Sequence, residues 1–147
     1  MSQYDEIRRL IEANPDVAEF ASFGDGTSEE WISRAEEALE CPLPETYKWW
    51  VRNFSGGAIG GEEIFSIYGE DFDTVVGGDI VCMYRLERQN SQRIPLCHSD
   101  VDGVFTFDSS LASSDGEYPI ISEATGKVYA SDFLDFLKKR IALFQSA

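Results

Sequence analysis

Apolar residues recur every three or four positions in several stretches of this chain, the spacing that places them on one face of a helix. The clearest case follows Leu43. Its predicted buried face comprises Tyr47, Trp50, Val51 and Phe54. Trp49 lies about 100° around the helix from that face. Pro44 suits the first turn, where its missing N–H would be unpaired anyway, and Gly56 and Gly57 can end the helix. This aromatic helix is predicted to organise the packing of the chain.

Three further helices are predicted on either side of the aromatic helix. The first opens the chain and ends at Asn14, because a residue before proline avoids the helical region. The second begins where Thr27 and Glu30 form a capping-box pattern. The third runs from Ile80 to about Arg88 and is capped by Asp79. A strand over 80–84 is the alternative, since short apolar runs fit both structures.

The last predicted helix is capped by Ser131 and closes the chain. Its predicted buried stripe consists of Phe133, Phe136, Leu137, Ile141 and Phe144. Lys138, Lys139 and Arg140 are expected near its C-terminus, where the helix dipole favours cations.

Short apolar runs separated by turn residues occupy the part of the chain before this last helix. The predicted strands are 64–68, 94–98, 104–107, 118–122 and 127–129. A chain of 147 residues is the length of one domain. Helices, then strands, then a closing helix predict a single α+β domain (1–147) with a central, mostly antiparallel sheet flanked by N-terminal helices and a C-terminal helix.

The net charge of −15, from 27 acids and 12 Lys and Arg, narrows the choice of partner. Such a field repels nucleic acid and anionic lipid and attracts basic partners. Two segments, from Arg52 to Arg85 and from Arg93 to Lys127, contain acids but no further Lys or Arg. Their acids are Glu62, Glu63, Glu70, Asp71, Asp73 and Asp79, then Asp100, Asp102, Asp108, Asp115, Glu117 and Glu123. If both segments share a face, they form a negative patch suited to a basic protein. The alternative is a set of unrelated solvated loops.

The cysteines and the N-terminus indicate a cytoplasmic protein. Cys41, Cys82 and Cys97 are widely spaced and form no CxxC pair, which fits reduced thiols. Charges interrupt the apolar residues at the N-terminus, unlike a signal peptide. No apolar run approaches the roughly 20 residues that cross a bilayer.

Known catalytic and metal-binding patterns do not fit this chain. The glycines of 56–61 lack the preceding strand and following helix of a phosphate loop. The segment 98–109 lacks the glutamate that completes a calcium loop. Cys97 and His98 are neighbours on a predicted strand, so they point to opposite faces. No cofactor, metal site or catalytic residue is predicted, and we expect a protein that is not an enzyme. A glycosidase-like pair of carboxylates is the alternative.

An ordered set of short motifs resembles the SUKH superfamily. The motifs in the first half are ISRAEEAL (32–39), LPETYKWW (43–50) and NFSGG (53–57). Those in the second half are IPL (94–96), DGVF (102–105), YPI (118–120) and SDFLDFL (131–137). The resemblance covers about residues 27–144 and includes no catalytic motif.

The resemblance implies an α+β fold and a binding function. Many bacterial members of the superfamily are immunity proteins that bind and block a cognate toxin domain, often a nuclease. The alternative is a non-enzymatic regulatory scaffold, the role of the yeast relative. The expected partner is therefore a basic protein toxin, since a nuclease must hold phosphates. The residues predicted to contact it are Trp49, Glu62, Glu63, Asp71, Asp73, Asp100 and Asp102.

Overall fold

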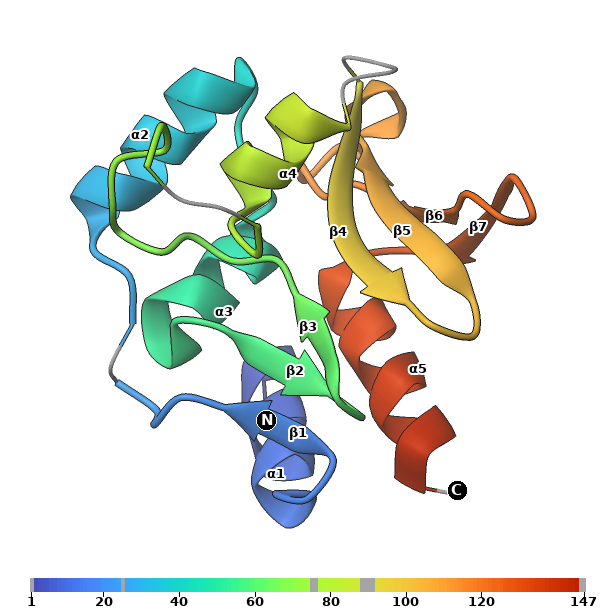
Figure 1. The fold of residues 1–147 in the computed structure, drawn as a ribbon. Coiled ribbons are helices and arrows are strands. Elements are labelled where there is room, and N and C mark those ends of the chain that lie inside the picture. The colour runs from blue at the N-terminus through green and yellow to red at the C-terminus, as the bar shows by residue number, and fades with distance from the viewer. Residues whose placement is uncertain (1, 25, 75–76, 88–91, 146–147) are drawn as a thin grey trace.

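The computed structural model describes residues 2–24, 26–74, 77–87 and 92–145, which contain five α-helices and seven β-strands (Figure 1). The helices are α1 (Gln3–Ala13), α2 (Glu29–Leu39), α3 (Glu45–Phe54), α4 (Ile80–Leu86) and α5 (Phe133–Gln145). The strands are β1 (Ala18–Phe20), β2 (Gly57–Ile59), β3 (Glu62–Ile64), β4 (Arg93–Ser99), β5 (Gly103–Asp108), β6 (Ile120–Ser122) and β7 (Lys127–Ala130).

The strands form one sheet in which each strand pairs with the next along the chain. Every pairing from β1 to β7 is antiparallel, which confirms the predicted α+β class. The pairing of β4 with β5 is the most extended, with a shift in register between Pro95 and Cys97. By contrast, β3 and β4 are paired only at Ile64 and Cys97, so the sheet has two parts that meet at one residue pair.

The aromatic helix α3 is the centre of the core, as its spacing predicts. Tyr47 and Trp50 are fully buried. The ring of Tyr47 lies 5.6 Å from that of Phe107 on β5 and 5.2 Å from that of Phe133 on α5. The Tyr47 hydroxyl also donates a hydrogen bond to the carbonyl of Phe65, at 2.7 Å. These contacts join α3 to the sheet and to the last helix.

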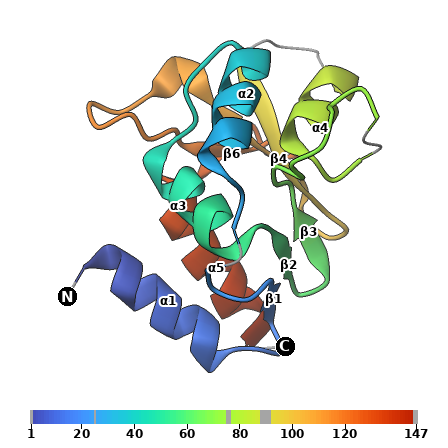
Figure 2. The ribbon, with the colours of Figure 1, turned by 90° about the vertical axis from the view of Figure 1, so that its left-hand side faces the viewer.

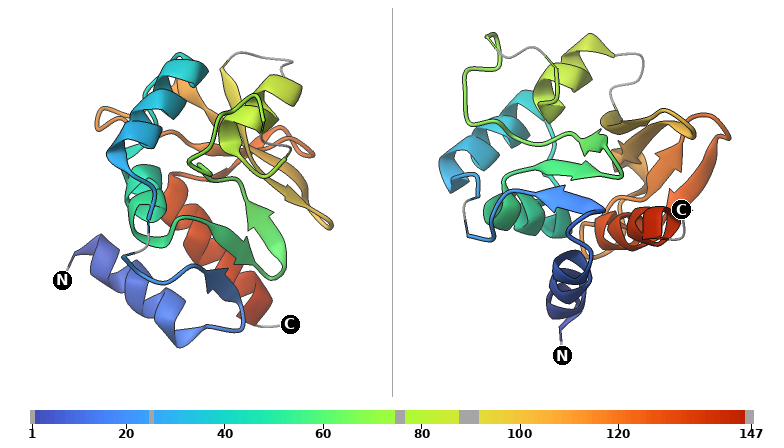
Figure 3. Two further views of the ribbon diagram at one scale, coloured as in Figure 1. Left: turned by 60° about the vertical axis from the view of Figure 1, so that its left-hand side comes forward. Right: turned by 60° about the horizontal axis from the view of Figure 1, so that its bottom comes forward.

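Helix α5 lies beside α3 and packs against β2, β7 and α1 (Figures 1 and 3). Ile7 and Ile11 of α1 are buried, and Tyr4 of the same helix stacks on Trp49 with 4.9 Å between ring centroids. The first helix ends at Asn14, as predicted, where the side-chain amide donates to the carbonyl of Leu10 at 2.8 Å.

The two faces of the β4–β5 pair have different surroundings. Phe105 and Phe107 of β5 point to the core, where Phe105 contacts Phe136 of α5 at 5.3 Å. Val104 and Thr106 alternate with them and therefore point to the opposite face. That outer face lies on the side away from α3 and α5.

The β2–β3 hairpin requires glycine in its turn and where it approaches β1. Gly60 and Gly61 form its turn with φ of +61° and +81°, a left-handed geometry that favours residues without a Cβ. Gly57 has φ +145°, and a Cβ there would lie 2.3 Å from the carbonyl oxygen of Glu19 on β1. The glycine pair predicted to end α3 thus also lets β1 approach β2.

Several predicted caps are shifted by one residue. Ser28, rather than Thr27, caps α2 through the N–H of Trp31, and the Thr27 hydroxyl instead donates to the carbonyl of Ile67 at 3.0 Å. Likewise, the Asp132 carboxylate, rather than Ser131, accepts from a first-turn N–H of α5 at 2.8 Å. Local propensity identifies the type of cap, but tertiary contacts select which residue fills it.

The segment after Asp79 is a helix, so the alternative strand over 80–84 is wrong. The Asp79 carboxylate accepts from the N–H groups of Val81 and Cys82 at 2.8 and 3.1 Å, which stabilises the first turn of α4. It also accepts from the N–H of Tyr68 at 3.0 Å. Arg88, the predicted end of this helix, lies outside the described residues.

Candidate functional site

Two of the acids predicted to contact a partner, Glu62 and Asp102, lie around a buried arginine. Arg140 of α5 places Nη2 2.5 Å from Glu62 Oε1 and Nη1 2.7 Å from Asp102 Oδ2. The other oxygen of Glu62 accepts from the Ser99 hydroxyl at 2.8 Å and from the Asp100 N–H at 3.0 Å. The side chain of Glu62 is only 8% exposed. We call Arg140, Glu62, Ser99 and Asp102 the arginine cluster; it places Glu62 inside the fold.

Arg140 differs most from its prediction, because it was expected near the C-terminus of the last helix and is instead buried. Its side chain is 2% exposed, and its guanidinium lies 5.0 Å from the ring of Phe105. Burial alone would lower the pKa of Arg140, but hydrogen bonds with Asp102, Tyr129 and Glu62 outweigh that effect and raise it. The prediction of a C-terminal cation is wrong, because α5 continues to Gln145 and its last turn holds no basic residue.

Glu63 lies next to Glu62 on β3 but points to the other side of the strand. Its side chain is exposed and accepts a hydrogen bond from the Tyr68 hydroxyl at 3.2 Å. Burial, followed by the neighbouring charge of Glu63, raises the pKa of Tyr68 to about 12. Among the described residues Glu63 has no cationic partner, so its charge remains uncompensated.

Asp71 and Asp73 lie in the loop that follows β3 and passes α2 and α4 (Figure 1). Asp71 Oδ1 accepts from the N–H of Asp73 at 3.0 Å, and its carbonyl accepts from the Thr74 hydroxyl at 2.8 Å. Asp73 in turn lies 3.2 Å from Arg85 of α4. Phe72, between the two acids, packs edge-on against Trp31 of α2, with 5.8 Å between ring centroids. Phe72 thereby fastens an acidic loop to α2.

A pocket of about 400 Å³ opens between this loop and α2. We call it the α2–loop pocket; its lining is Trp31, Arg34, Glu37, Ala38, Asp71 and Phe72. The guanidinium of Arg34 lies 4.7 Å from the Trp31 ring and is paired with Glu30 at 2.8 Å. Glu37 and Asp71 are exposed and have no cationic partner among the described residues. The pocket thus combines two partly buried aromatic rings with uncompensated carboxylates.

Trp49, the predicted aromatic anchor, is partly covered by the N-terminal helix. One side of its ring stacks on Tyr4 of α1, and Phe54 meets it edge-on at 5.8 Å. The sequence analysis predicted that this ring contacts a partner, which requires it to be exposed. The structure has α1 cover it, and Trp31 is the tryptophan that lines a pocket.

The acids of the two acid-only segments lie in different parts of the fold. Figure 2 shows the loop that contains Asp71 and the loop that contains Asp115 on opposite sides of the molecule. Four acids of these segments are buried, and all four accept hydrogen bonds within the fold: Glu62, Asp79, Asp108 and Glu117. Those exposed without a cationic partner in the described chain are Glu63, Glu70, Asp71, Asp100 and Asp115.

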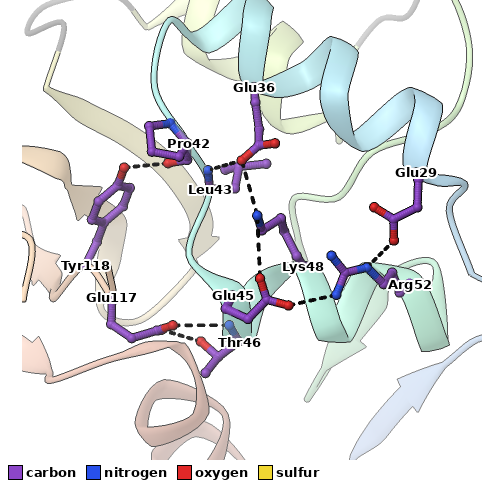
Figure 4. Close-up of polar contacts among 10 residues, drawn as sticks. All are labelled: Glu29, Glu36, Pro42, Leu43, Glu45, Thr46, Lys48, Arg52, Glu117 and Tyr118. Atoms are coloured by element: carbon purple, nitrogen blue, oxygen red, sulfur yellow. Dashed lines mark hydrogen bonds and ion pairs between the residues drawn. The ribbon is translucent and has the colours of Figure 1, made fainter. Parts of the chain in front are cut away.

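The buried acid Glu117 accepts hydrogen bonds at the N-terminus of α3 (Figure 4). Pro44 has no side chain that can cap α3, and Glu117 supplies the acceptor instead, at 3.2 Å from the N–H of Thr46 and 2.5 Å from its hydroxyl. Burial raises the pKa of the Glu117 carboxyl, while these hydrogen bonds act in the opposite direction.

The leucine–proline corner before α3 is fixed in a similar way. Glu36 of α2 accepts from the N–H of Leu43 at 2.7 Å, and the Tyr118 hydroxyl donates to the carbonyl of Pro42 (Figure 4). The acids and the tyrosine at this corner therefore stabilise the fold.

In the described part of the chain, no three His, Cys, Asp or Glu side chains converge as a metal site would require. His98 and Cys97 point to opposite faces, as their places on a strand predict: Cys97 is buried, and exposed His98 lies 2.6 Å from Glu87. None of the helices within the described ranges has the length and apolar character needed to cross a bilayer.

A comparison with known protein families agrees with the resemblance noted in the sequence. Residues 26–139 match the model of the SMI1 / KNR4 family (SUKH-1). The match begins just before α2 and extends into α5, so it includes the α2–loop pocket and most of the sheet. This chain therefore belongs to the SMI1 / KNR4 family (SUKH-1).

Proposed function

We propose that this protein is a bacterial immunity protein, which binds a basic toxin domain and neutralises it without catalysing a reaction. The observation that carries the proposal is the α2–loop pocket, which Trp31 and Phe72 line together with Arg34 and two carboxylates, Glu37 and Asp71, that pair with no cation of the described chain. Membership of a family that includes immunity proteins supports the same function.

The charge of this surface favours a basic partner. Glu37 and Asp71 line the pocket, and exposed Glu70 lies beside Asp71 in the loop. Their charges are part of the net charge of −15 of the whole chain. Electrostatic complementarity of this kind mainly accelerates association, and it is reduced by salt. The surface therefore suits a toxin that must be captured quickly, before it reaches its target.

Charge alone does not provide the affinity that neutralisation requires. A nanomolar complex corresponds to about −12 kcal/mol, and most of it usually comes from a few well-packed residues, often Trp, Tyr and Arg. Trp31 and Phe72 are suitable, since both are partly buried and each is held by a neighbouring ring or guanidinium. An arginine or lysine of the toxin can lie on these rings and pair with Glu37 or Asp71.

The test is survival of cells that produce a toxin, and the gene next to the one for this chain is expected to encode it. Co-production of the wild-type chain is expected to restore growth, and the double charge reversal Glu37→Lys with Asp71→Lys is expected to reduce the rescue. Glu12→Lys is the matched control, because Glu12 is an exposed helical glutamate on α1, which lies apart from α2 in Figure 1. Failure of the wild-type chain to rescue, with cellular proteins as the only partners recovered, would support the regulatory scaffold instead.

A further inference from the structure

We propose a second contact surface for the partner, on the outer face of the β4–β5 pair. A groove of about 610 Å³ lies there, and we call it the sheet groove. It is inferred to hold a segment of the basic partner in which an aliphatic side chain lies next to an arginine or lysine. This inference rests on the proposed function, because the occupant belongs to the same partner protein.

The floor and one wall of the sheet groove are apolar. Pro95 of β4 and Val104 of β5 contribute to the floor, and Leu86 at the end of α4 forms part of the wall. Leu86 is 69% exposed, so its side chain is available to a partner. On the same face, Val128 of β7 is 57% exposed, whereas Ile121 of β6, which pairs with both Thr106 and Val128, is buried. Apolar surface of this kind, next to polar residues, is typical of protein-binding sites.

Two glutamates line the groove in fixed positions. Glu87 Oε1 lies 2.6 Å from His98 Nε2. Glu123 Oε1 lies 2.7 Å from Arg93 Nη1 and accepts from the Thr106 hydroxyl at 2.7 Å. Side chains that are already held lose little conformational entropy when a partner binds. The apolar floor is thus bordered by preorganised acceptors.

The charge balance of the groove selects the kind of occupant. Among the described residues that line the groove, two are carboxylates, Glu87 and Glu123, and one is a guanidinium, Arg93, which pairs with Glu123 and with buried Asp108 behind it. A second copy of this chain would bring another net charge of −15 to an already negative border, which repulsion opposes. A basic segment is attracted by the same border, and its aliphatic side chain can cover Val104 and Leu86.

The experiment uses three acetylated tripeptide amides as probes of the ¹⁵N-labelled protein: Arg-Leu-Arg, Arg-Gly-Arg and Glu-Leu-Glu. Saturable amide shifts are expected at Leu86, Val104 and Thr106 with Arg-Leu-Arg, and weaker ones with the other two. Leu86→Ser is expected to weaken Arg-Leu-Arg binding about tenfold, since it removes most of one apolar contact. Leu143→Ser is the matched control, an exposed leucine on α5, and is expected to change nothing.

The charge of the groove is tested with Glu87→Gln combined with Glu123→Gln, which is expected to weaken Arg-Leu-Arg and reduce its salt dependence. The inference is overturned if no saturable shifts occur, or if Arg-Gly-Arg or Glu-Leu-Glu binds as well as Arg-Leu-Arg. It is also overturned if the shifts map to Trp31 and Asp71 and are lost in Glu37→Gln. That last result would leave the proposed function intact, because it assigns the basic partner to the α2–loop pocket alone.

Discussion

Replacing Arg140 by methionine tests whether the arginine cluster holds the two parts of the sheet together. The substitution keeps an unbranched side chain of similar length but removes the guanidinium. Glu62 then remains 8% exposed without its cation. Removing one partner of a buried pair costs about 3 to 5 kcal/mol. Glu62 keeps the hydrogen bonds from Ser99 and Asp100, so we expect a loss near the lower end, about 3 kcal/mol.

The size of this loss is large compared with the total stability of a domain, which is about 5 to 15 kcal/mol. Asp102→Asn is expected to cost less than about 1 kcal/mol, because its side chain is 39% exposed and solvent screens the pair. A double variant, Arg140→Met with Glu62→Leu, is expected to be more stable than Arg140→Met alone, since it no longer buries an unpaired charge. The two substitutions are thus predicted to be coupled.

Urea unfolding followed by tryptophan fluorescence measures these free energies, with Lys138→Met as the matched control on the exposed side of α5. That control is expected to change stability by less than about 0.5 kcal/mol. Equal losses for Arg140→Met and Lys138→Met, or strict additivity in the double variant, would refute the argument.

Three further predictions concern a cap, a thiol and a turn. Glu117→Ala is expected to cost about 1 to 2 kcal/mol in urea unfolding through loss of the α3 cap, and Glu117→Gln less, since the amide keeps an acceptor and removes a buried charge; equal costs would contradict this. Burial raises the pKa of Cys97 to about 12, so at pH 8 Cys97 should react with iodoacetamide more slowly than half-buried Cys41, as mass spectrometry would show. Gly57→Ala, where a Cβ would meet a β1 carbonyl, should destabilise more than Gly61→Ala, which meets open space; the opposite order of melting temperatures would be inconsistent with the hairpin geometry.

Periodicity was sufficient to predict the helices and strands β4 to β7. It missed β1 and β2, and the strand predicted over 64–68 is wrong beyond Ile64, where β3 ends. The buried face of α3 is correct at Tyr47, Trp50, Val51 and Phe54, because a helix in a small domain has to bury its apolar side. Strands β4 and β5 were predictable from short apolar runs on both sides of a turn, although each is buried over four consecutive residues. The local pattern was enough to predict an element such as α3, which has one solvent-exposed side and one buried side.

The candidate site was less predictable, since it depends on contacts between distant parts of the chain. In the sequence, Arg140 is one of three consecutive cations on a predicted helix. In the structure it is buried and bonded to Glu62 and Asp102, which lie 78 and 38 residues away along the chain. Trp49 lies off the apolar stripe of α3, as expected, yet α1 covers it. Nothing local distinguishes Glu62 from Glu63, although the first is buried and the second exposed. An acid-rich segment therefore predicts a surface charge less well than it predicts a loop.

The central claim is that acidic side chains around Trp31 and Phe72 capture a basic protein toxin. The measurement that tests it most directly is the association rate of the purified chain with the toxin domain that it is expected to neutralise, at low and at high salt. Wild-type association is predicted to be fast at low salt and to slow at high salt, and Glu37→Lys with Asp71→Lys to be about tenfold slower at low salt. A rate that neither salt nor this charge reversal changes would contradict the account.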